Sequence, residues 1–162
     1  MNKMEKLEQA IQLRQDDKPE EALLILKELL FELPDDPGVN YQAAWTCDCM
    51  GKESEAVPFY ETAIANGLSG EELQGAFLGL GSTYRCLGEY QNSLDTFDRA
   101  IKEFPNDRSL KTFRALTLYN LGKYSNSVEE LLVQLVDTTS DADIKSYENA
   151  LKFYADKLDQ TW

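Results

Sequence analysis

The sequence predicts an all-α protein built from pairs of antiparallel helices, and two observations carry this prediction. Residues 87–90 read LGEY and residues 121–124 read LGKY, and their glycines, Gly88 and Gly122, are 34 residues apart. Around these glycines, apolar residues recur at steps of three and four, which is the period of an amphipathic helix. A repeat of 20 to 50 residues is typical of chains that stack identical supersecondary units.

The repeats can be followed along the chain when each is numbered so that the glycine between its two helices stands at position 15. Gly51 anchors a further repeat in the same way, and the first repeat has Asp17 at this position. The predicted repeats are 3–36, 37–70, 74–107 and 108–141, with residues 71–73 as an insertion after the second.

Two positions of the repeat hold small side chains throughout, as the closest crossing of two packed helices requires. They are position 8 (Ala10, Ala44, Gly81, Ala115) and position 20 (Ala22, Ala56, Ser93, Ser127). Two other positions hold large apolar side chains, which we expect to fill the space between successive hairpins. They are position 24 (Leu26, Tyr60, Phe97, Leu131) and position 28 (Leu30, Ile64, Ile101, Leu135).

The third repeat resembles the tetratricopeptide repeat (TPR) family. It reads F-x-x-L-G-x-x-Y from Phe77 and continues with Ser93, Phe97, Ala100 and Pro105, and the family pattern is W-x-x-L-G-x-x-Y, A-x-x-x-F, A and P. The resemblance implies an all-α, right-handed superhelix of about four helix-turn-helix hairpins. It further implies one TPR domain over residues 1–162.

Local signals mark several helix ends. Asp36 followed by Pro37 predicts an N-cap and a proline at the first helical position. The pattern S-x-x-[DE] predicts capping boxes at Ser69 with Glu72 and at Ser140 with Asp143.

The tail after the fourth repeat predicts a capping helix over residues 142–160. Its apolar residues stand at helical steps of three and four, namely Ile144, Tyr147, Leu151, Tyr154 and Leu158. A terminal hairpin exposes the face that its next neighbour would cover, so stacked repeats need such a cap.

The composition argues against catalysis. The chain has no histidine, so it lacks the commonest general base and the commonest zinc ligand. Gly79 and Gly81 lie within a predicted helix, which indicates close helix packing and not a phosphate loop. We therefore predict that the protein is not an enzyme and that it has no catalytic residue, no cofactor and no metal site.

Charge and cysteines narrow the partners and the compartment. The net charge of −13, with Lys and Arg scattered singly, argues against nucleic acid and anionic membranes as partners. The three cysteines form no expected disulfide framework, and we expect Cys47 to fill a core position and Cys49 to be exposed. No apolar run reaches membrane-spanning length and no signal peptide is recognisable, so we expect a cytoplasmic protein.

The TPR resemblance implies a concave groove lined by the first helix of each repeat, at positions 2, 5, 6, 9, 12 and 13. Tyr41 and Trp45 are expected to be exposed there, whereas some of the aliphatic side chains could equally pack between neighbouring helices. The candidate partner-binding residues are Leu7, Ile11, Arg14, Tyr41, Trp45, Leu78, Ser82, Arg85, Thr112, Leu116 and Tyr119.

One known use of TPR grooves is capture of acidic C-terminal peptides by a carboxylate clamp of Lys, Asn and Arg. The matching positions hold none of these residues in either register: Leu7, Ile11, Gln42, Gly75 and Gly79, or Tyr41, Trp45, Gly79, Ser109 and Phe113. The sequence therefore predicts a scaffold or adaptor that binds, without a clamp, a peptide or amphipathic helix carrying apolar and basic residues.

Two alternatives remain open at this point. One is an acidic TPR chaperone for a secreted or assembly-prone substrate, because this chain is similar in size and charge to small acidic bacterial TPR proteins that hold unfolded secretion substrates. The other is a self-assembling TPR module in which the end hairpins or Trp162 dock on a second copy. The expected oligomeric state is a monomer or a weak homodimer.

Overall fold

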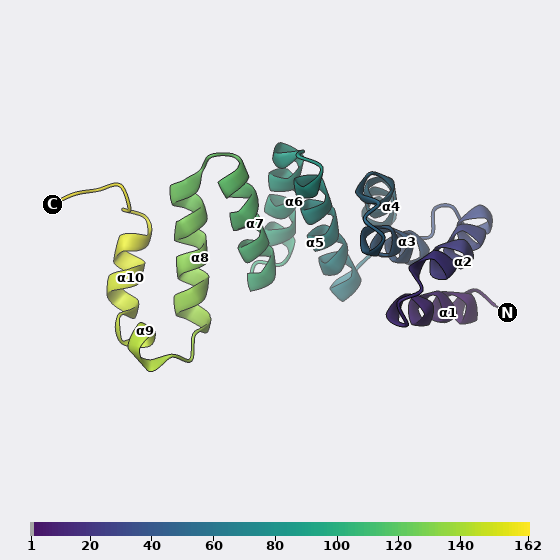
Figure 1. The fold of residues 1–162 in the computed structure, drawn as a ribbon, viewed down its shortest axis with the longest axis horizontal. Coiled ribbons are helices and arrows are strands. Elements are labelled where there is room, and N and C mark those ends of the chain that lie inside the picture. Colours follow the sequence, from purple (N-terminus) through teal and green to yellow (C-terminus); the bar gives the residue numbers. More distant parts are fainter. Residues whose placement is uncertain (1) are drawn as a thin grey trace. The chain divides into compact units, whose positions relative to one another are not determined.

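A computed structural model describes residues 2–162 (Figure 1). The described chain contains helices, turns and loops and no strand. The helices are α1 (Lys3–Gln15), α2 (Pro19–Glu32), α3 (Pro37–Cys49), α4 (Glu53–Ala65), α5 (Gly70–Cys86), α6 (Tyr90–Glu103), α7 (Arg108–Asn120), α8 (Tyr124–Thr138), α9 (Ala142–Ser146) and α10 (Glu148–Ala155). The predicted all-α class is confirmed.

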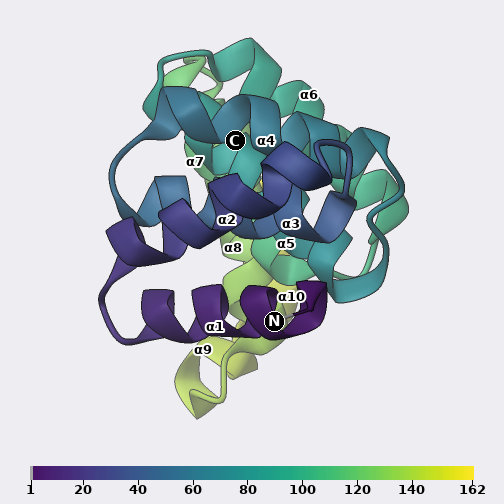
Figure 2. The ribbon, with the colours of Figure 1, turned by 90° about the vertical axis from the view of Figure 1, so that its right-hand side faces the viewer.

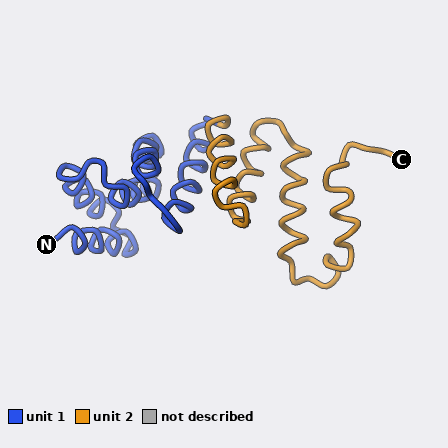
Figure 3. The backbone as a smooth tube through the Cα atoms, turned by 180° about the vertical axis from the view of Figure 1, so that it is seen from behind, with its two compact units in different colours: residues 1–89 blue, residues 90–162 orange. Residues whose placement is uncertain are grey.

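The chain forms two compact units, which Figure 3 shows in different colours. Unit 1 ends at Glu89 and contains α1 to α5, and unit 2 begins at Tyr90 and contains α6 to α10. Within the units, α1 packs with α2, α3 with α4, and α7 with α8. Figure 2 shows the antiparallel course of the first of these hairpins. The expected single domain with four repeats stays a prediction.

In the α1–α2, α3–α4 and α7–α8 hairpins, the small residues at positions 8 and 20 lie where the sequence predicts, at the closest contact between the two helices. Ala10 and Ala22 are fully buried in one cluster, and Ala44 and Ala56 are fully buried in another. In the α7–α8 hairpin the Ser127 hydroxyl donates a 2.6 Å hydrogen bond to the backbone carbonyl of position 8. The prediction for these positions is confirmed.

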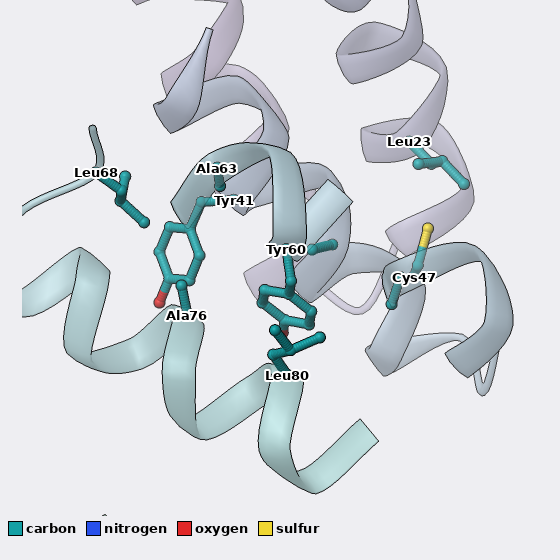
Figure 4. Close-up of a cluster of buried hydrophobic side chains, with 10 residues drawn as sticks. Leu23, Tyr41, Cys47, Tyr60, Ala63, Leu68, Ala76 and Leu80 are labelled. Atoms are coloured by element: carbon teal, nitrogen blue, oxygen red, sulfur yellow. The ribbon is translucent and has the colours of Figure 1, made fainter. Parts of the chain in front are cut away.

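Contact between hairpins in unit 1 depends on the glycines of α5. Tyr41 and Tyr60 point toward this helix in Figure 4, where Ala76 and Leu80 are also drawn. A Cβ atom at Gly79 would lie inside the contact distance of the Tyr60 ring. Gly79 is therefore a close-packing site, as predicted.

The cysteine assignments are confirmed. Cys47 is fully buried in the α3–α4–α5 core, and Cys49 is exposed. Burial raises the pKa of the Cys47 thiol to about 11, so this residue is protonated at neutral pH.

Asp48 joins three helices of unit 1. Its carboxylate accepts hydrogen bonds from the Tyr60 hydroxyl of α4 at 2.7 Å and from Thr83 Oγ1 of α5 at 2.9 and 3.0 Å. Burial raises the pKa of Asp48, and the two hydrogen bonds only partly oppose this effect. The side chain therefore links α3 to its neighbours while its charge carries a desolvation cost.

The same turn follows the first helix of each predicted repeat. The residue at position 15 is left-handed each time, with φ of 60° at Asp17 and 73° at Gly122. A backbone hydrogen bond of 2.9 Å then runs back across the turn from position 16 to position 11, as in a Schellman motif. Asp17 is the only non-glycine residue of the described chain with a positive φ.

Helix ends agree with the sequence in one case and differ in others. Asp36 caps α3 through the backbone N–H of Val39, ahead of Pro37, as predicted. The capping box at Ser69 is wrong, because its side chain makes no capping hydrogen bond. The inserted residues 71–73 continue α5, which begins at Gly70. The capping box at Ser140 is also wrong, because Asp141 caps α9 instead.

The predicted capping helix over residues 142–160 is instead two short helices, α9 and α10, separated by Tyr147. Ala155, the buried residue of α10, packs in unit 2, where α10 lies beside α8 (Figure 1). Of the predicted capping residues, Ile144 and Leu151 are half-buried. Tyr147, Tyr154 and Leu158 are exposed, since the short α10 covers only part of its neighbour.

The apolar residues predicted to fill the space after the fourth hairpin are also exposed. Leu131 and Leu135 keep 38% and 46% of their surface in water. The reason is the position of α10 and the residues after it, which are held to α8 by Lys152 with Asp137 and by Asp159 with Ser125. These contacts lie on another side of α8.

The turns predict a stability difference that can be measured. Gly122→Ala should lower the free energy of unfolding by about 1–2 kcal/mol, because a Cβ is strained in the left-handed region. Asp17→Gly should raise it by up to about 1 kcal/mol by removing that strain. The measurement is urea unfolding followed by circular dichroism. Asp16→Gly is the control, since Asp16 has a φ of −83°, and a gain there would contradict the explanation.

Asp48 predicts a pH dependence. Because the pKa of Asp48 is raised by folding, the folded state holds this proton more tightly than the unfolded state. Stability is therefore lost as pH rises from the ordinary carboxyl pKa through the folded pKa of Asp48. Asp48→Asn keeps an acceptor oxygen and removes the charge. The stability of the Asp48→Asn variant relative to wild type should increase as the pH is raised from 4 to 7.

Unfolding in urea at several pH values measures this effect. Asp35→Asn is the matched control, because Asp35 lies exposed in the loop before α3. An equal pH-dependent gain in both variants would mean that general charge repulsion, and not burial of Asp48, is responsible.

Candidate protein-binding surface

The first helices of the hairpins in unit 1 lie next to one another, because α3 packs against both α1 and α5. Eight of the predicted binding residues are on these helices, and we call the surface that α1, α3 and α5 share the α1–α3–α5 surface. They are Leu7, Ile11 and Arg14 on α1, Tyr41 and Trp45 on α3, and Leu78, Ser82 and Arg85 on α5.

Arg14 and Trp45 form the central contact of this surface. The guanidinium carbon of Arg14 lies 4.1 Å from the Trp45 ring centroid, within the range of a cation–π interaction. The same guanidinium donates to Thr46 Oγ1 at 3.2 Å and to the Gln42 carbonyl at 3.4 Å. Burial lowers the pKa of Arg14, although a guanidinium stays charged in proteins. The indole is thus held in place while 45% of Trp45 stays exposed.

The expectation that Tyr41 is exposed is wrong. Only 8% of its surface is accessible, and burial raises its pKa. Its hydroxyl occupies the space that a side chain at Gly75 would need. Its ring lies 5.9 Å from Trp45 and 6.4 Å from Tyr60, centroid to centroid. Tyr41 therefore packs beside the Trp45 ring and joins α3 to α5.

The remaining predicted residues of unit 1 are half-buried: Leu7, Ile11, Leu78, Ser82 and Arg85. Leu7 packs against the buried cluster that contains Ala10 and Leu26. For Leu7 the structure therefore favours the alternative of packing between helices. Its outer part borders the α1–α3–α5 surface.

The other three predicted residues are on α7, in unit 2. Leu116 is 39% exposed and Tyr119 is 61% exposed, and the half-buried Thr112 donates to the Arg108 carbonyl at 2.8 Å. The Tyr119 ring lies 5.1 Å from that of Tyr124 on α8. Leu116 is thus a surface residue and not a core residue.

Sequence reasoning missed the residues that hold Arg14. Thr46 is fully buried and Gln42 is 6% exposed, and the side-chain oxygen of Gln42 is buried without a hydrogen-bond partner among residues 2–162. The sequence did carry a signal, namely the polar residues Gln42 and Thr46 on α3, a helix that is buried along much of its length. Buried polar groups on such a helix indicate a nearby hydrogen-bonding partner.

A cavity of about 530 Å³ in unit 2 was also not predicted. It is lined by residues of α6, α7 and α8, including Lys111 and Glu129, and by Lys123 in the turn before α8. Arg114 crosses it and pairs with Glu130 at 2.7 Å and with Asp98 at 2.8 Å. Its walls carry both signs of charge, so they favour no single class of ligand.

Within residues 2–162 no group of three His, Cys, Asp or Glu side chains could hold a metal ion. None of the helices in this range combines the length and the hydropathy needed to cross a bilayer.

Comparison with known proteins agrees with the geometry. The family model described as tetratrico peptide repeat matches residues 37–158. Superkiller protein 3 of Saccharomyces cerevisiae (strain ATCC 204508 / S288c) is 28% identical over 80 residues, which is 49% of this chain but only 5% of that protein. The chain therefore spans a small part of this relative.

Two solved structures have a similar fold. The MamA RS-1 ArsTM double mutant has a TM-score of 0.71 and 17% identity, over 91% of this chain and 82% of that one. The APC/C hetero-tetramer Cut9-Hcn1 has a TM-score of 0.71 and 18% identity, over 93% of this chain and 29% of that one. With the family match over most of its length, the chain belongs to the tetratricopeptide repeat family.

Proposed function

We propose that the protein is an interaction scaffold whose α1–α3–α5 surface binds a segment of another protein, with Trp45 as the main anchor. Membership in the TPR family supports the general role. The Cut9-Hcn1 structure, a hetero-tetramer of two proteins, is an example in which this fold takes part in a protein complex.

The observation that carries the proposal is the state of Trp45. Almost half of its surface is in water, yet Arg14 stacks on it and Tyr41 lies beside it. Tryptophan, tyrosine and arginine are the residue types that dominate binding hot spots. A side chain that is already immobilised loses little conformational entropy on binding. Trp45 is therefore a preorganised apolar anchor.

Charge indicates the kind of segment that fits. Residues 1–89 contain 7 basic and 17 acidic residues, a net charge of −10, whereas residues 90–162 contain 9 basic and 12 acidic residues, a net charge of −3. The acidic field of residues 1–89 attracts a basic ligand and speeds its association. We infer a segment with one apolar or aromatic residue for Trp45 and with Lys or Arg around it.

The same side chains support the proposal that binding takes place without a carboxylate clamp. Gly75 and Gly79 offer no donor and face Tyr41 and Tyr60, and Gln42 is buried. The Arg14 guanidinium already donates to Thr46 and to a backbone carbonyl. A ligand carboxylate would have to compete with these acceptors for Arg14. We likewise assign no catalytic residue to this surface, since its side chains offer no paired nucleophile and base.

Trp45→Ala should weaken partner binding at least tenfold, because it removes the apolar anchor. Proteins captured from native lysate by wild type and by this variant are compared by mass spectrometry. The Kd of a captured partner is then measured by calorimetry. Phe31→Ala is the matched control, since Phe31 is an aromatic residue of the same unit, 91% exposed on α2, and it should change the Kd less than twofold.

Two further measurements address the ligand directly. In Trp162→Phe protein Trp45 is the remaining tryptophan, so its fluorescence should shift to the blue as a segment covers it. Peptides with one aromatic residue, made in basic and acidic versions, should bind only as the basic version and more weakly at high salt. Unchanged fluorescence during binding, or equal binding by both versions, would place the ligand elsewhere.

A further inference from the structure

An apolar stripe runs along the outer side of α8 and lies open to water. It consists of Tyr124, Val128, Leu131 and Leu135, with exposed fractions of 59%, 46%, 38% and 46%. We call it the α8 seam. Adjacent apolar side chains of this size are unusual on a surface that meets only water.

Two of the corresponding positions, 21 and 24, are covered by the next helix in earlier repeats. In the first hairpin Leu23 and Leu26 are 4% and 0% exposed, and α3 packs against their helix. In the third repeat Leu94 and Phe97 are 8% and 0% exposed, and α7 packs against α6. The α8 seam therefore has the composition of a face that receives a helix.

The seam is free of charge within an acidic chain. At about 100° per residue, Glu129, Glu130 and Asp137 project roughly 130° or more away from the seam around the axis of α8. Glu130 and Asp137 are also paired, with Arg114 and with Arg108 and Lys152. Unit 2 as a whole carries a net charge of only −3. A second copy could approach here without a large electrostatic cost.

The spacing of the seam suits an antiparallel copy of itself. Its steps of four, three and four residues are those of the d-a-d-a positions of a coiled coil. In a two-fold arrangement Val128 would lie opposite Leu131 of the second copy, and Tyr124 opposite Leu135 of the second copy. Each contact would then occur twice, which is the property of an isologous interface.

Docking of the seam on the first hairpin of a second copy is disfavoured. In α3 the residues that pack against the preceding helix are Val39 and Ala43, at positions 3 and 7. In α1 the same positions hold Glu5 and Gln9, and both are exposed. The outer face of α1 is therefore polar and does not match an apolar seam.

We propose that this surface is a homodimer interface, in which the α8 seams of two copies pack antiparallel around a two-fold axis. With Tyr119 beside it, the seam exposes roughly 450 Å² of side-chain surface, taking about 200 Å² for a whole aromatic side chain. An interface of standard size buries about 800 Å² per partner, with a polar rim around the apolar centre. The expected affinity is on the order of 1–100 μM.

The mass of the full chain tests the proposal. Sedimentation equilibrium should show the 18.4 kDa monomer at low concentration and twice that mass above the Kd. Leu131→Glu with Leu135→Glu should raise the dimer Kd at least 100-fold, because four carboxylates would meet at the seam. Circular dichroism should remain unchanged, since both residues are already exposed.

Leu24→Glu with Phe31→Glu is the matched control. These residues are 66% and 91% exposed on α2, in the other unit, and the variant should still dimerise. Wild type that stays monomeric up to millimolar concentration would overturn the proposal and leave the seam to a helix of another protein. A seam variant that dimerises like wild type would overturn it as well.

Cross-linking tests the antiparallel register. In protein with Cys47→Ala, Cys49→Ser and Cys86→Ser, a short thiol-reactive cross-linker should join two copies through Val128→Cys, close to the axis. It should not join them through Tyr124→Cys, which would lie on the order of 16 Å along the helix from its equivalent. Equal cross-linking at both positions would exclude this register.

The outcome is independent of the proposed α1–α3–α5 surface. Trp45→Ala should leave the dimer Kd within twofold of wild type, because Trp45 is in unit 1. A failed dimer test therefore leaves the proposed partner surface untouched, and failure of the Trp45 test leaves the seam untouched.

Discussion

The close crossing of two helices within each hairpin is the constraint on which the rest of the structure depends. At this crossing the Ser127 hydroxyl reaches the Ala115 carbonyl at 2.6 Å, a distance that leaves no room for a larger side chain. Ala10, Ala22, Ala44 and Ala56 are all fully buried for the same reason. Overpacking such a site typically costs about 1–3 kcal/mol. Because the crossing recurs, the first helices of unit 1 come to lie together, with α3 against both α1 and α5.

The fold was predictable because this constraint requires particular residue types at single positions, and these positions recur in every repeat of the sequence. Small side chains at two positions and a left-handed residue at the turn can be recognised without knowing what they touch. The helix ends were less predictable, since a cap depends on whether one side chain reaches one N–H. Ser69 has the right residue type and makes no such bond, while Asp141 replaces its neighbour Ser140. The insertion of residues 71–73 lengthened a helix because nothing in it breaks helical periodicity.

The candidate surface was only partly predictable because it depends on pairs of residues from different repeats. Trp45 is exposed as expected, but its partner Arg14 comes from the preceding hairpin. Tyr41 is buried because Gly75, one hairpin later, leaves space for its hydroxyl. A repeat pattern assigns each residue to a position in its own repeat, but it does not show which residue of the neighbouring repeat that side chain will contact. The tail shows the same limit: its periodicity predicted a helix, yet the break at Tyr147 left much of its apolar face in water.

The uneven charge of the chain has a consequence for how binding and self-association can coexist. A net charge of −10 in the first 89 residues makes contact between two copies of unit 1 unfavourable, and the same field attracts a basic ligand. Unit 2 has nearly balanced charges, and it carries the α8 seam, whose four apolar side chains are exposed. At physiological ionic strength the screening length is about 8 Å, so a copy docked on the α8 seam senses mainly the charges of α7, α8 and α10. There Glu130 and Asp137 are already paired with cations. The charge distribution is thus compatible with dimerisation through unit 2, whereas unit 1 repels a second copy and attracts a basic ligand.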